Sequence, residues 1–410
     1  MPMSSRNTVK LFSKRMLMLG GYPGLVLMAR PVIQLFFTRG RALSEYATVD
    51  TSAMVFILYA VIAFCVSLQY LFTKDWPFIK KVLFGSPIQW FVYYTALSFI
   101  SMFWSVDPPL TGFRAFECLS MLLLTVTSIT QLYRNTHDTD IVIQWSLLYT
   151  FFSIIISLII RARWDHGLGL FQASQMVATT FFYLAVFHSR SQVIRWTIIL
   201  FSILSFSTTA YIGMTLGLSG LLFTKMKYRF VLFFCAILAG IAVSYIGIDT
   251  VLKNTIFINH QEAVGGDLES ILEDSSGRNH VWEAALESTV ETPWGYGFFA
   301  GEPYILYARN LGGITAHNSF LSALMGVGPL GMLLLACYFL FFGPVLLSRY
   351  IPSNYRPALI GCFCVGIAHS MGNPGIGSRV YGSWIPVTHI LVLIVCIFLF
   401  NKYVVKKVHP

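Results

Sequence analysis

Long apolar stretches, separated by short polar ones, follow one another along the whole chain. Several of them exceed about 18 residues, the length that a helix needs to cross the hydrocarbon core of a bilayer. The pattern predicts an all-α fold of about twelve transmembrane helices. The predicted spans are residues 16–38, 52–73, 84–104, 114–133, 139–160, 167–188, 193–207, 209–223, 229–247, 317–347, 357–372 and 385–402.

The polar connections between these spans predict how the chain is oriented. With a cytoplasmic N-terminus, alternation places both termini and five basic connections inside: residues 74–81, 133–138, 189–195, 224–229 and 348–356. These segments hold most of the 28 lysines and arginines, as the positive-inside rule expects.

One connection is much longer than the others. We therefore divide the chain into nine N-terminal spans (1–247), a large extracytoplasmic loop (248–316) and three C-terminal spans (317–410). Long loops of this kind usually carry function.

The composition supports a membrane protein. Hydrophobic residues make up 56% of the chain and charged residues 11%, whereas soluble chains carry about 25% charged residues. The net charge of +10 follows from the basic cytoplasmic connections, so the expected partner is the lipid bilayer and not nucleic acid. The seven cysteines lie in apolar stretches without metal-site spacing, and neither a metal nor another cofactor is expected.

The long loop contains the segment SSGRNHVWEAALESTVETPWGYGFF, residues 275–299, which predicts an amphipathic helix. Ser276 is its expected N-cap, and Pro293 should stop it. Its apolar face should comprise Trp282, Ala285 and Leu286. Arg278 then lies in the first turn, where free N–H groups and the helix dipole favour an anion. Its guanidinium suits a phosphate, although an arginine at this depth also fits a contact with lipid headgroups.

The segment GITAHNSFLSALMGVGPLG, residues 313–331, begins polar and becomes a membrane span. His317 and Asn318 stand at its extracytoplasmic end. At 3.6 residues per turn, Gly328 and Gly331 lie three and four turns further on the same face, where small residues let another helix cross closely. Histidine is the natural general base near neutral pH, while a lone histidine here is more often a capping or interfacial residue.

Further arginines lie on the predicted extracytoplasmic side. Arg114 ends the Pro-rich turn WSVDPPLTGFR at a helix start, and Arg163, Arg309 and Arg379 lie in other segments of that side. Arginines at these places suit a diphosphate, and each one singly also fits a headgroup contact. The chain has no Walker-type glycine loop, no HExxH and no CxxC, and its long loop has no Asp-x-Asp pair. Glu117 is the main ionisable residue inside a span, which argues against an ion-coupled transporter.

Three of these segments together resemble the O-antigen ligase and polymerase superfamily of bacterial envelopes. The first is the pattern His-Asn, nine residues, Gly, two residues, Gly, from His317 to Gly331. The second is SGRNHVWEAAL followed by TPWGYGF, and the third, FWSVDPPLTGFRA, is similar to the polymerase branch. The resemblance covers roughly residues 100–400.

The resemblance implies a GT-C-like fold and a metal-independent, inverting glycosyl transfer at the periplasmic face of the inner membrane. The donor is then a glycan on undecaprenyl diphosphate, and the acceptor is a glycan hydroxyl. By the family pattern, His317 deprotonates the acceptor and Arg278 holds the leaving diphosphate. The further substrate contacts are expected from Asn318, Arg114, Arg163, Arg309 and Arg379.

One position departs from the family pattern. The family often has an arginine at the start of a middle helix, where this chain has Thr208 in the stretch SFSTTAY. Another cation then has to supply the second phosphate contact, and Arg163 and Arg379 are the candidates.

Three functions stay open at this point. The leading one is a polymerase that extends lipid-linked repeat units, with a chain-length regulator protein as a further partner. The second is a ligase that transfers the glycan from the same donor onto lipid A core. The third, from another class, is a flippase or transporter for lipids or glycans.

Overall fold

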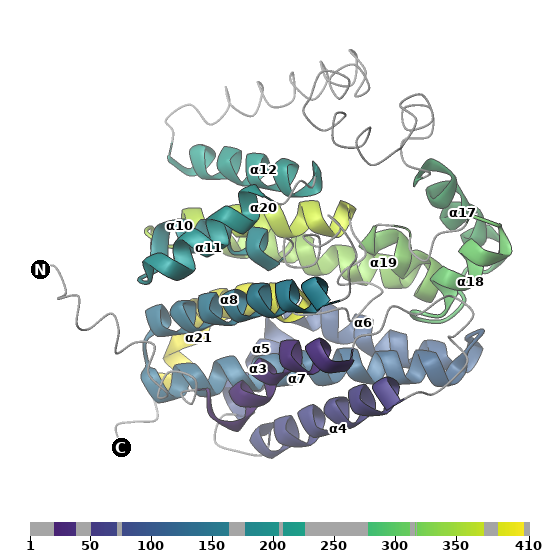
Figure 1. Ribbon diagram of the computed structural model, residues 1–410, viewed down its shortest axis with the longest axis horizontal. Coiled ribbons are helices and arrows are strands. Elements are labelled where there is room, and N and C mark those ends of the chain that lie inside the picture. Colours follow the sequence, from purple (N-terminus) through teal and green to yellow (C-terminus); the bar gives the residue numbers. More distant parts are fainter. Residues whose placement is uncertain are drawn as a thin grey trace, which may run out of the picture.

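The computed structural model describes residues 20–37, 51–71, 76–163, 177–204, 208–225, 278–311, 316, 318–372 and 384–405. Within these ranges every regular element is a helix and no strand occurs (Figure 1). The helices are α3 (Gly21–Phe37), α4 (Thr51–Leu71), α5 (Trp76–Gly85), α6 (Ile88–Ile100), the 3₁₀ helix η2 (Ser101–Trp104), α7 (Pro108–Thr136), α8 (Thr139–Arg163), α10 (Phe182–His188), α11 (Gln192–Ile203), α12 (Thr208–Lys225), α17 (Arg278–Glu291), α18 (Gly301–Ala308), α19 (Ser319–Leu346), α20 (Arg356–Gly372) and α21 (Trp384–Val405).

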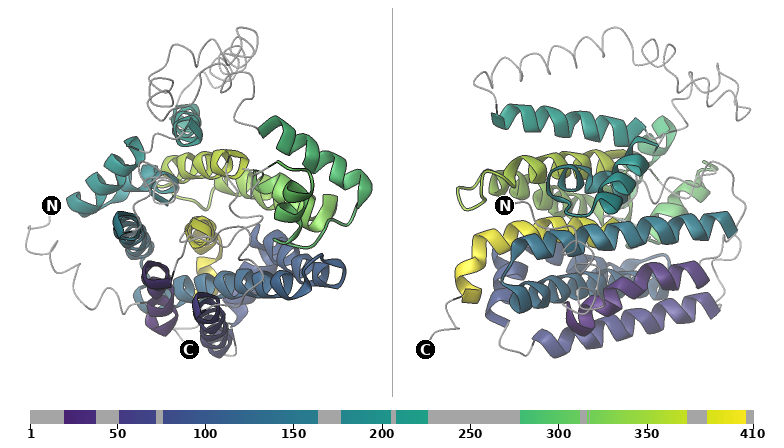
Figure 2. Two further views of the ribbon diagram at one scale, coloured as in Figure 1. Left: turned by 45° about the vertical axis from the view of Figure 1, so that its right-hand side comes forward. Right: turned by 60° about the vertical axis from the view of Figure 1, so that its left-hand side comes forward.

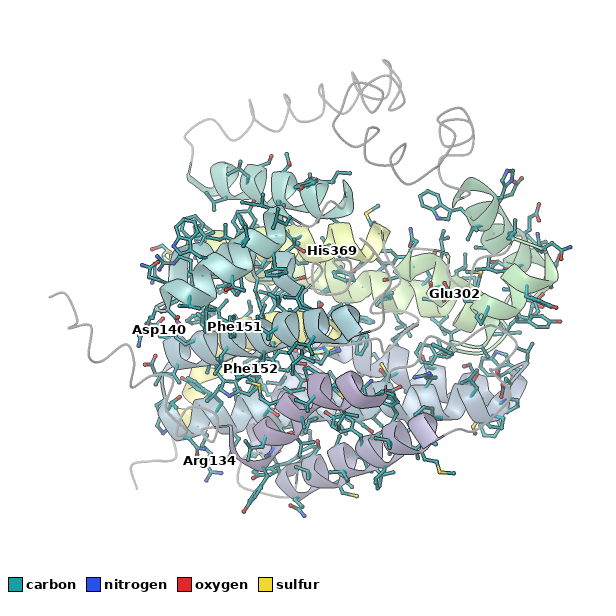
Figure 3. The ribbon with its side chains drawn as sticks, in the orientation of Figure 1. Arg134, Asp140, Phe151, Phe152, Glu302 and His369 are labelled. Carbon is teal, nitrogen blue, oxygen red and sulfur yellow. The ribbon has the colours of Figure 1, made fainter. Side chains whose placement is uncertain are left out.

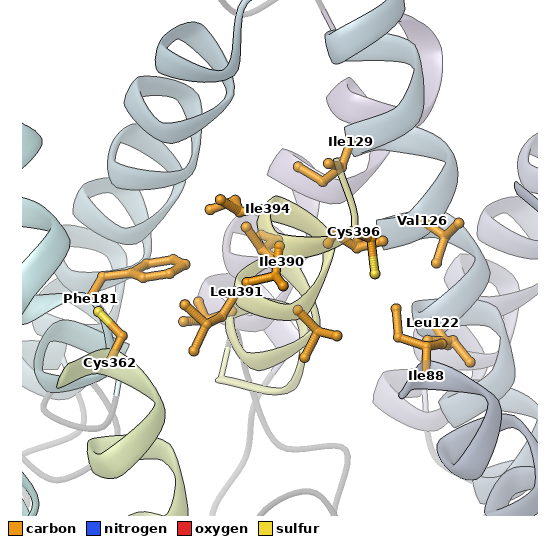
Figure 4. Close-up of a cluster of buried hydrophobic side chains, with 14 of the residues drawn as sticks. Ile88, Leu122, Val126, Ile129, Phe181, Cys362, Ile390, Leu391, Ile394 and Cys396 are labelled. Carbon is orange, nitrogen blue, oxygen red and sulfur yellow. The ribbon is translucent and has the colours of Figure 1, made fainter. Parts of the chain in front are cut away.

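The core of the bundle is built around α21. The end-on view of Figure 2 shows this helix between α7 and α8 on one side and α20 on the other, in agreement with its packing contacts. Its residues from Ile390 to Ile397 are all buried. In Figure 4 the side chains of Ile390, Leu391, Ile394 and Cys396 lie between two groups. One group is Ile88, Leu122, Val126 and Ile129, and the other is Phe181 and Cys362.

The outer surface of the bundle is apolar, as expected of a protein surrounded by lipid. Large hydrophobic side chains point outward from several helices, which a water-soluble surface rarely tolerates over large areas. They include Met54, Leu58, Val61, Ile62, Val193, Leu200, Leu216, Leu333 and Leu340. Among the described residues three helices are long and apolar enough to cross a membrane: Pro108–Thr136, Thr139–Ile156 and Ser319–Leu346. The all-α membrane fold is confirmed, while the count of twelve spans stays a prediction.

Two predicted boundaries on the N-terminal side are wrong. Residues 74–81 were expected to be a cytoplasmic loop, but α5 begins at Trp76. Its residues Phe78, Ile79, Val82 and Leu83 share one buried face, and amphipathic spacing of this kind stabilises a helix on the bundle. Residues 86–87 then separate α5 from α6, which divides the predicted span 84–104.

Arg114 does not stand at a helix start. The helix α7 begins at Pro108, because the Asp107 side chain accepts a hydrogen bond from the Leu110 N–H at 3.1 Å and so caps it. Proline is well tolerated in the first turn, where its missing N–H has no helical partner to lose. Arg114 therefore lies in the second turn of the helix, within the bundle.

The helix α17 agrees with the prediction at its C-terminal end and only in part in its faces. It ends at Glu291, two residues before Pro293, while Ser276 lies outside the described residues. Its buried side comprises Val281, Ala284, Ala285 and Ser288. Leu286, which was expected on the apolar face, is exposed, because the buried side of the helix runs through positions 281, 284, 285 and 288 instead.

Candidate functional site

The three segments that carry the family resemblance meet at one end of the bundle. The loop from Pro293 to Phe298 lies between the middle of α19 and the segment around η2 and the start of α7. On the η2 side, the Val106 N–H donates to the Tyr296 carbonyl at 3.0 Å, and the Trp104 indole N–H donates to the Trp294 carbonyl at 3.0 Å. The segments are far apart in sequence, so their meeting is a property of the fold.

A break in α19 receives this loop. Gly328 has non-helical backbone angles, φ 74° and ψ −173°, so α19 is kinked and not the straight helix that the sequence predicted. Pro329 has no N–H to donate to the Met325 carbonyl, which would be its helical acceptor. That carbonyl accepts instead from the Tyr296 N–H at 2.9 Å, and the Gly326 carbonyl accepts from the Gly297 N–H at 2.8 Å.

Glycine is required at two positions of this junction. A Cβ on Gly328 would lie 2.3 Å from the Pro293 carbonyl oxygen, and one on Gly297 would lie 2.0 Å from the Ser105 hydroxyl oxygen. Both residues also have positive φ, which disfavours any larger side chain. The close approach at Gly328 is therefore made by the loop and not by a crossing helix, which corrects the expectation from the His317 pattern.

The backbone of Ala316, the residue before His317, is held at both of its polar groups. Its N–H donates to Glu302 Oε1 of α18 at 2.6 Å. Its carbonyl accepts from the Trp282 indole N–H of α17 at 3.1 Å. Trp282 lies four residues after Arg278, on the same side of α17. Two loop helices thus fix the peptide groups that lead into the predicted base.

Asn318, the residue after His317, is the N-cap of α19. Its side-chain oxygen accepts from the Phe320 N–H at 2.9 Å and from the Leu321 N–H at 3.2 Å. An N-cap of this kind satisfies donors that a helix start leaves free. The polar beginning of this span therefore has a structural role, and a substrate contact of Asn318 stays a prediction.

Arg114 belongs to a buried ionic cluster beside the same loop. Its Nη1 lies 2.8 Å from Glu117 Oε2, and Arg30 Nη2 of α3 lies 2.6 Å from Glu117 Oε1. The Arg114 guanidinium also stacks over the Phe299 ring at 4.5 Å. Phe299 has a φ of 66°, which is rare for a bulky residue. The cluster joins α3 and α7 to the loop that docks on α19.

Arg309 joins the two loop helices. Its guanidinium, at the end of α18, lies 3.0 Å from Glu291 Oε1 and also bonds Glu287, both of α17. These carboxylates are exposed, so each pair alone contributes little to stability. The arrangement gives Arg309 a bridging role, and its contact with substrate stays a prediction.

The remaining predicted site residues are described less completely. His317 and Arg379 lie outside the described residues. Arg278, Arg163 and Thr208 are the first residue of α17, the last of α8 and the first of α12, and only their backbone is described. The structure thus brings the helix that begins at Arg278 into contact with Ala316, the residue before His317. Within the described ranges, no three His, Cys, Asp or Glu side chains gather as a metal site would require.

The sequence pattern missed two residues of this region, Glu302 and Arg30. Glu302 is one acidic residue in a loop that holds more than half of the 18 in the chain, so its burial has no local signal. The one hint is that it stands within the otherwise uncharged run from Thr292 to Ala308. Arg30 lies in the first predicted span. Its pairing with Glu117 has no signal in the sequence, because the two residues are 87 positions apart.

Fold, surface and site define a helical membrane protein with a polar junction at one end. Residues 193–336 match the family model described as O-Antigen ligase, and no curated protein matches the chain. The match confirms the resemblance to the O-antigen ligase and polymerase superfamily. It contains α17, the loop and the first part of α19, and hence Arg278, His317 and Gly328.

Proposed function

We propose that the protein is a glycosyltransferase of the bacterial inner membrane that polymerises lipid-linked glycan repeat units. The donor is a glycan on undecaprenyl diphosphate, and the acceptor is a sugar hydroxyl of another lipid-linked repeat unit. The observation that carries the proposal is the hydrogen bond from Trp282 to Ala316, which joins the helix that begins at Arg278 to the residue before His317. The family match over this region supports it.

The proposed reaction needs a base and a cation, and no metal. His317 takes the proton of the acceptor hydroxyl as its oxygen bonds to the anomeric carbon of the donor. The bond between that carbon and the diphosphate oxygen breaks, and the diphosphate leaves with the electron pair. Arg278, at the helix N-terminus, stabilises the charge that develops on it, since fixed cations act strongly on a leaving group in a partly desolvated site.

Arg114 is proposed as a further contact to the same donor. Its guanidinium contacts the Phe299 ring, directly after the docked loop, and its side chain is partly exposed, at 24%, whereas Arg30 and Glu117 are buried. Glu117 and the Phe299 ring fix its orientation, so its remaining donors can meet an anion without further ordering. Arg163 and Arg379 stay proposals for the contact that Thr208 cannot supply.

A ligase that transfers the glycan to lipid A core is the second candidate. It is favoured by the description of the matching family model, O-Antigen ligase. The polymerase is favoured by the segment around Val106 and Pro108, which resembles the polymerase branch and packs against the loop. Both enzymes use the same donor, so the described contacts are compatible with either. The proposed polymerase has twelve membrane spans in a GT-C-like fold, with its site on the periplasmic face. Its proposed partner is a chain-length regulator protein.

Deleting the gene and separating the envelope glycans on a gel tests the proposal. A polymerase predicts that the ladder disappears while core carrying one repeat unit remains. A ligase predicts bare core together with lipid-linked polymer. An unchanged ladder would contradict both enzymes, and lipid-linked units retained on the cytoplasmic side would favour a flippase.

A further inference from the structure

Glu302 is a buried carboxylate in an unusual setting. It is 1% exposed, and among the described residues it forms no ion pair with a lysine, arginine or histidine. Figure 3 labels it at the end of the bundle opposite Arg134 and Asp140. Burying a carboxylate costs free energy unless hydrogen bonds compensate for the lost water, so the hydrogen bonds of Glu302 determine how it is accommodated.

One oxygen of this carboxylate holds two points of the chain. Glu302 Oε1 accepts from the Ala316 N–H at 2.6 Å and from the Ser322 hydroxyl at 2.7 Å. Ala316 precedes position 317, and Ser322 lies in the first turn or so of α19, after it. A single acceptor therefore ties together the two sides of the segment that contains the predicted base.

The described residues on both sides of position 317 are held by hydrogen bonds. Ala316 is fixed by Glu302 and Trp282, and Asn318 is fixed as the N-cap of α19. Among the described contacts, the two hydrogen bonds to Glu302 connect Ala316, before this position, to Ser322, after it.

We propose that Glu302 is a positioning residue, which holds the backbone on both sides of position 317 so that His317 can act on the acceptor hydroxyl. This inference rests on the proposed function, because it assigns to Glu302 a role through the proposed base. Glu302 itself touches no reacting atom. For this role residue 302 needs an oxygen atom that accepts both hydrogen bonds, and the negative charge of the carboxylate matters less than that oxygen.

The test compares variants of the purified full-length protein in lipid nanodiscs. The substrate is the lipid-linked repeat unit that accumulates in a strain lacking the gene. Glu302→Ala removes the acceptor, and we expect kcat to fall about 100-fold, since a displacement of about 1 Å at a reacting group has that effect. The KM for the donor should stay within about twofold, because the arginines that bind the diphosphate are untouched.

Two milder variants keep the test valid if Glu302→Ala folds poorly. Glu302→Gln keeps an oxygen at the same place, and we expect kcat within about tenfold of the wild type. Ser322→Ala removes one of the two hydrogen bonds and should lower kcat by a few-fold. Glu283→Ala is the matched control, because Glu283 is an exposed carboxylate of the neighbouring helix α17, and its kcat should equal the wild-type value.

Three results would overturn the proposal. They are wild-type kcat in Glu302→Ala, a Glu302→Gln variant as slow as Glu302→Ala, and a loss of donor binding in step with the loss of turnover. The last pattern is what a merely structural role produces. His317→Ala is measured alongside: if it turns over normally the proposed function fails, whatever Glu302 does, whereas a slow His317→Ala with a normal Glu302→Ala refutes only the positioning role.

Discussion

Two buried carboxylates lie close to the docked loop, and they are satisfied in opposite ways. Glu117, inside the bundle, is shared by the guanidinium groups of Arg30 and Arg114. Glu302, in the loop region, accepts from an amide and a hydroxyl, both neutral. A buried ionic cluster depends on charge balance, whereas a neutral hydrogen-bond site depends on geometry. The contacts of Glu117 therefore depend on its charge, and those of Glu302 on where its oxygen lies.

The same substitution at both sites separates the two roles. Glu117→Gln leaves the buried guanidinium of Arg30 and the partly exposed one of Arg114 without their carboxylate, and we expect the free energy of unfolding to fall by about 3 kcal/mol. Glu302→Gln keeps an acceptor oxygen, and we expect a loss of about 1 kcal/mol. Thermal unfolding of the two variants in one detergent measures the difference. Equal shifts would contradict the distinction.

Gly328→Ala should damage the loop region and leave the ionic cluster intact. A Cβ there would lie 2.3 Å from the Pro293 carbonyl oxygen, at a φ that alanine rarely adopts. We expect the loop to move off α19, a loss of about 2 kcal/mol in stability, and turnover lower by at least tenfold. Gly343→Ala is the control in the same helix, since its Cβ would make ordinary contacts with Phe363 at 3.5 Å. Similar behaviour of both variants would refute the docking of the loop.

Trp282→Phe should have the smallest effect of the three. It keeps an aromatic ring on α17 but removes the five-membered ring of the indole, and with it the N–H that donates to the Ala316 carbonyl. We expect about 1 kcal/mol in stability and a few-fold loss in kcat. Trp196→Phe, at an exposed position of α11, is the reference for a tryptophan without this bond and should leave kcat unchanged. A kcat for Trp282→Phe equal to that of the wild type would show that Glu302 alone fixes Ala316.

The sequence predicts the helices of this protein well and their junctions poorly. Periodicity and length place α11 and α20 within a few residues of their observed bounds, because apolar runs determine them locally. The kink in α19 was missed, although Gly328 and Pro329 are adjacent, because a long apolar run reads as one helix. The kink is stabilised by the loop, whose N–H groups bond the Met325 and Gly326 carbonyls at the break.

For the candidate site, the sequence supplies the segments but not their contacts. The motif spacing selects Arg278 and His317 by resemblance, and their roles stay predictions. The structure adds the hydrogen bond from Trp282, four residues after Arg278, to Ala316, the residue before His317. Glu302 and the Arg30–Glu117 pair could not be found from the pattern. They depend on contacts between segments that only the folded chain brings side by side, and a single charged letter in the sequence does not reveal its burial.

The most direct test of the account measures glycan elongation by the purified protein from the purified lipid-linked repeat unit, with and without EDTA. We expect the wild type to elongate the glycan at the same rate in both buffers. His317→Ala should elongate it at least about 100-fold more slowly while it still binds the donor. Elongation by His317→Ala at the wild-type rate would contradict the account.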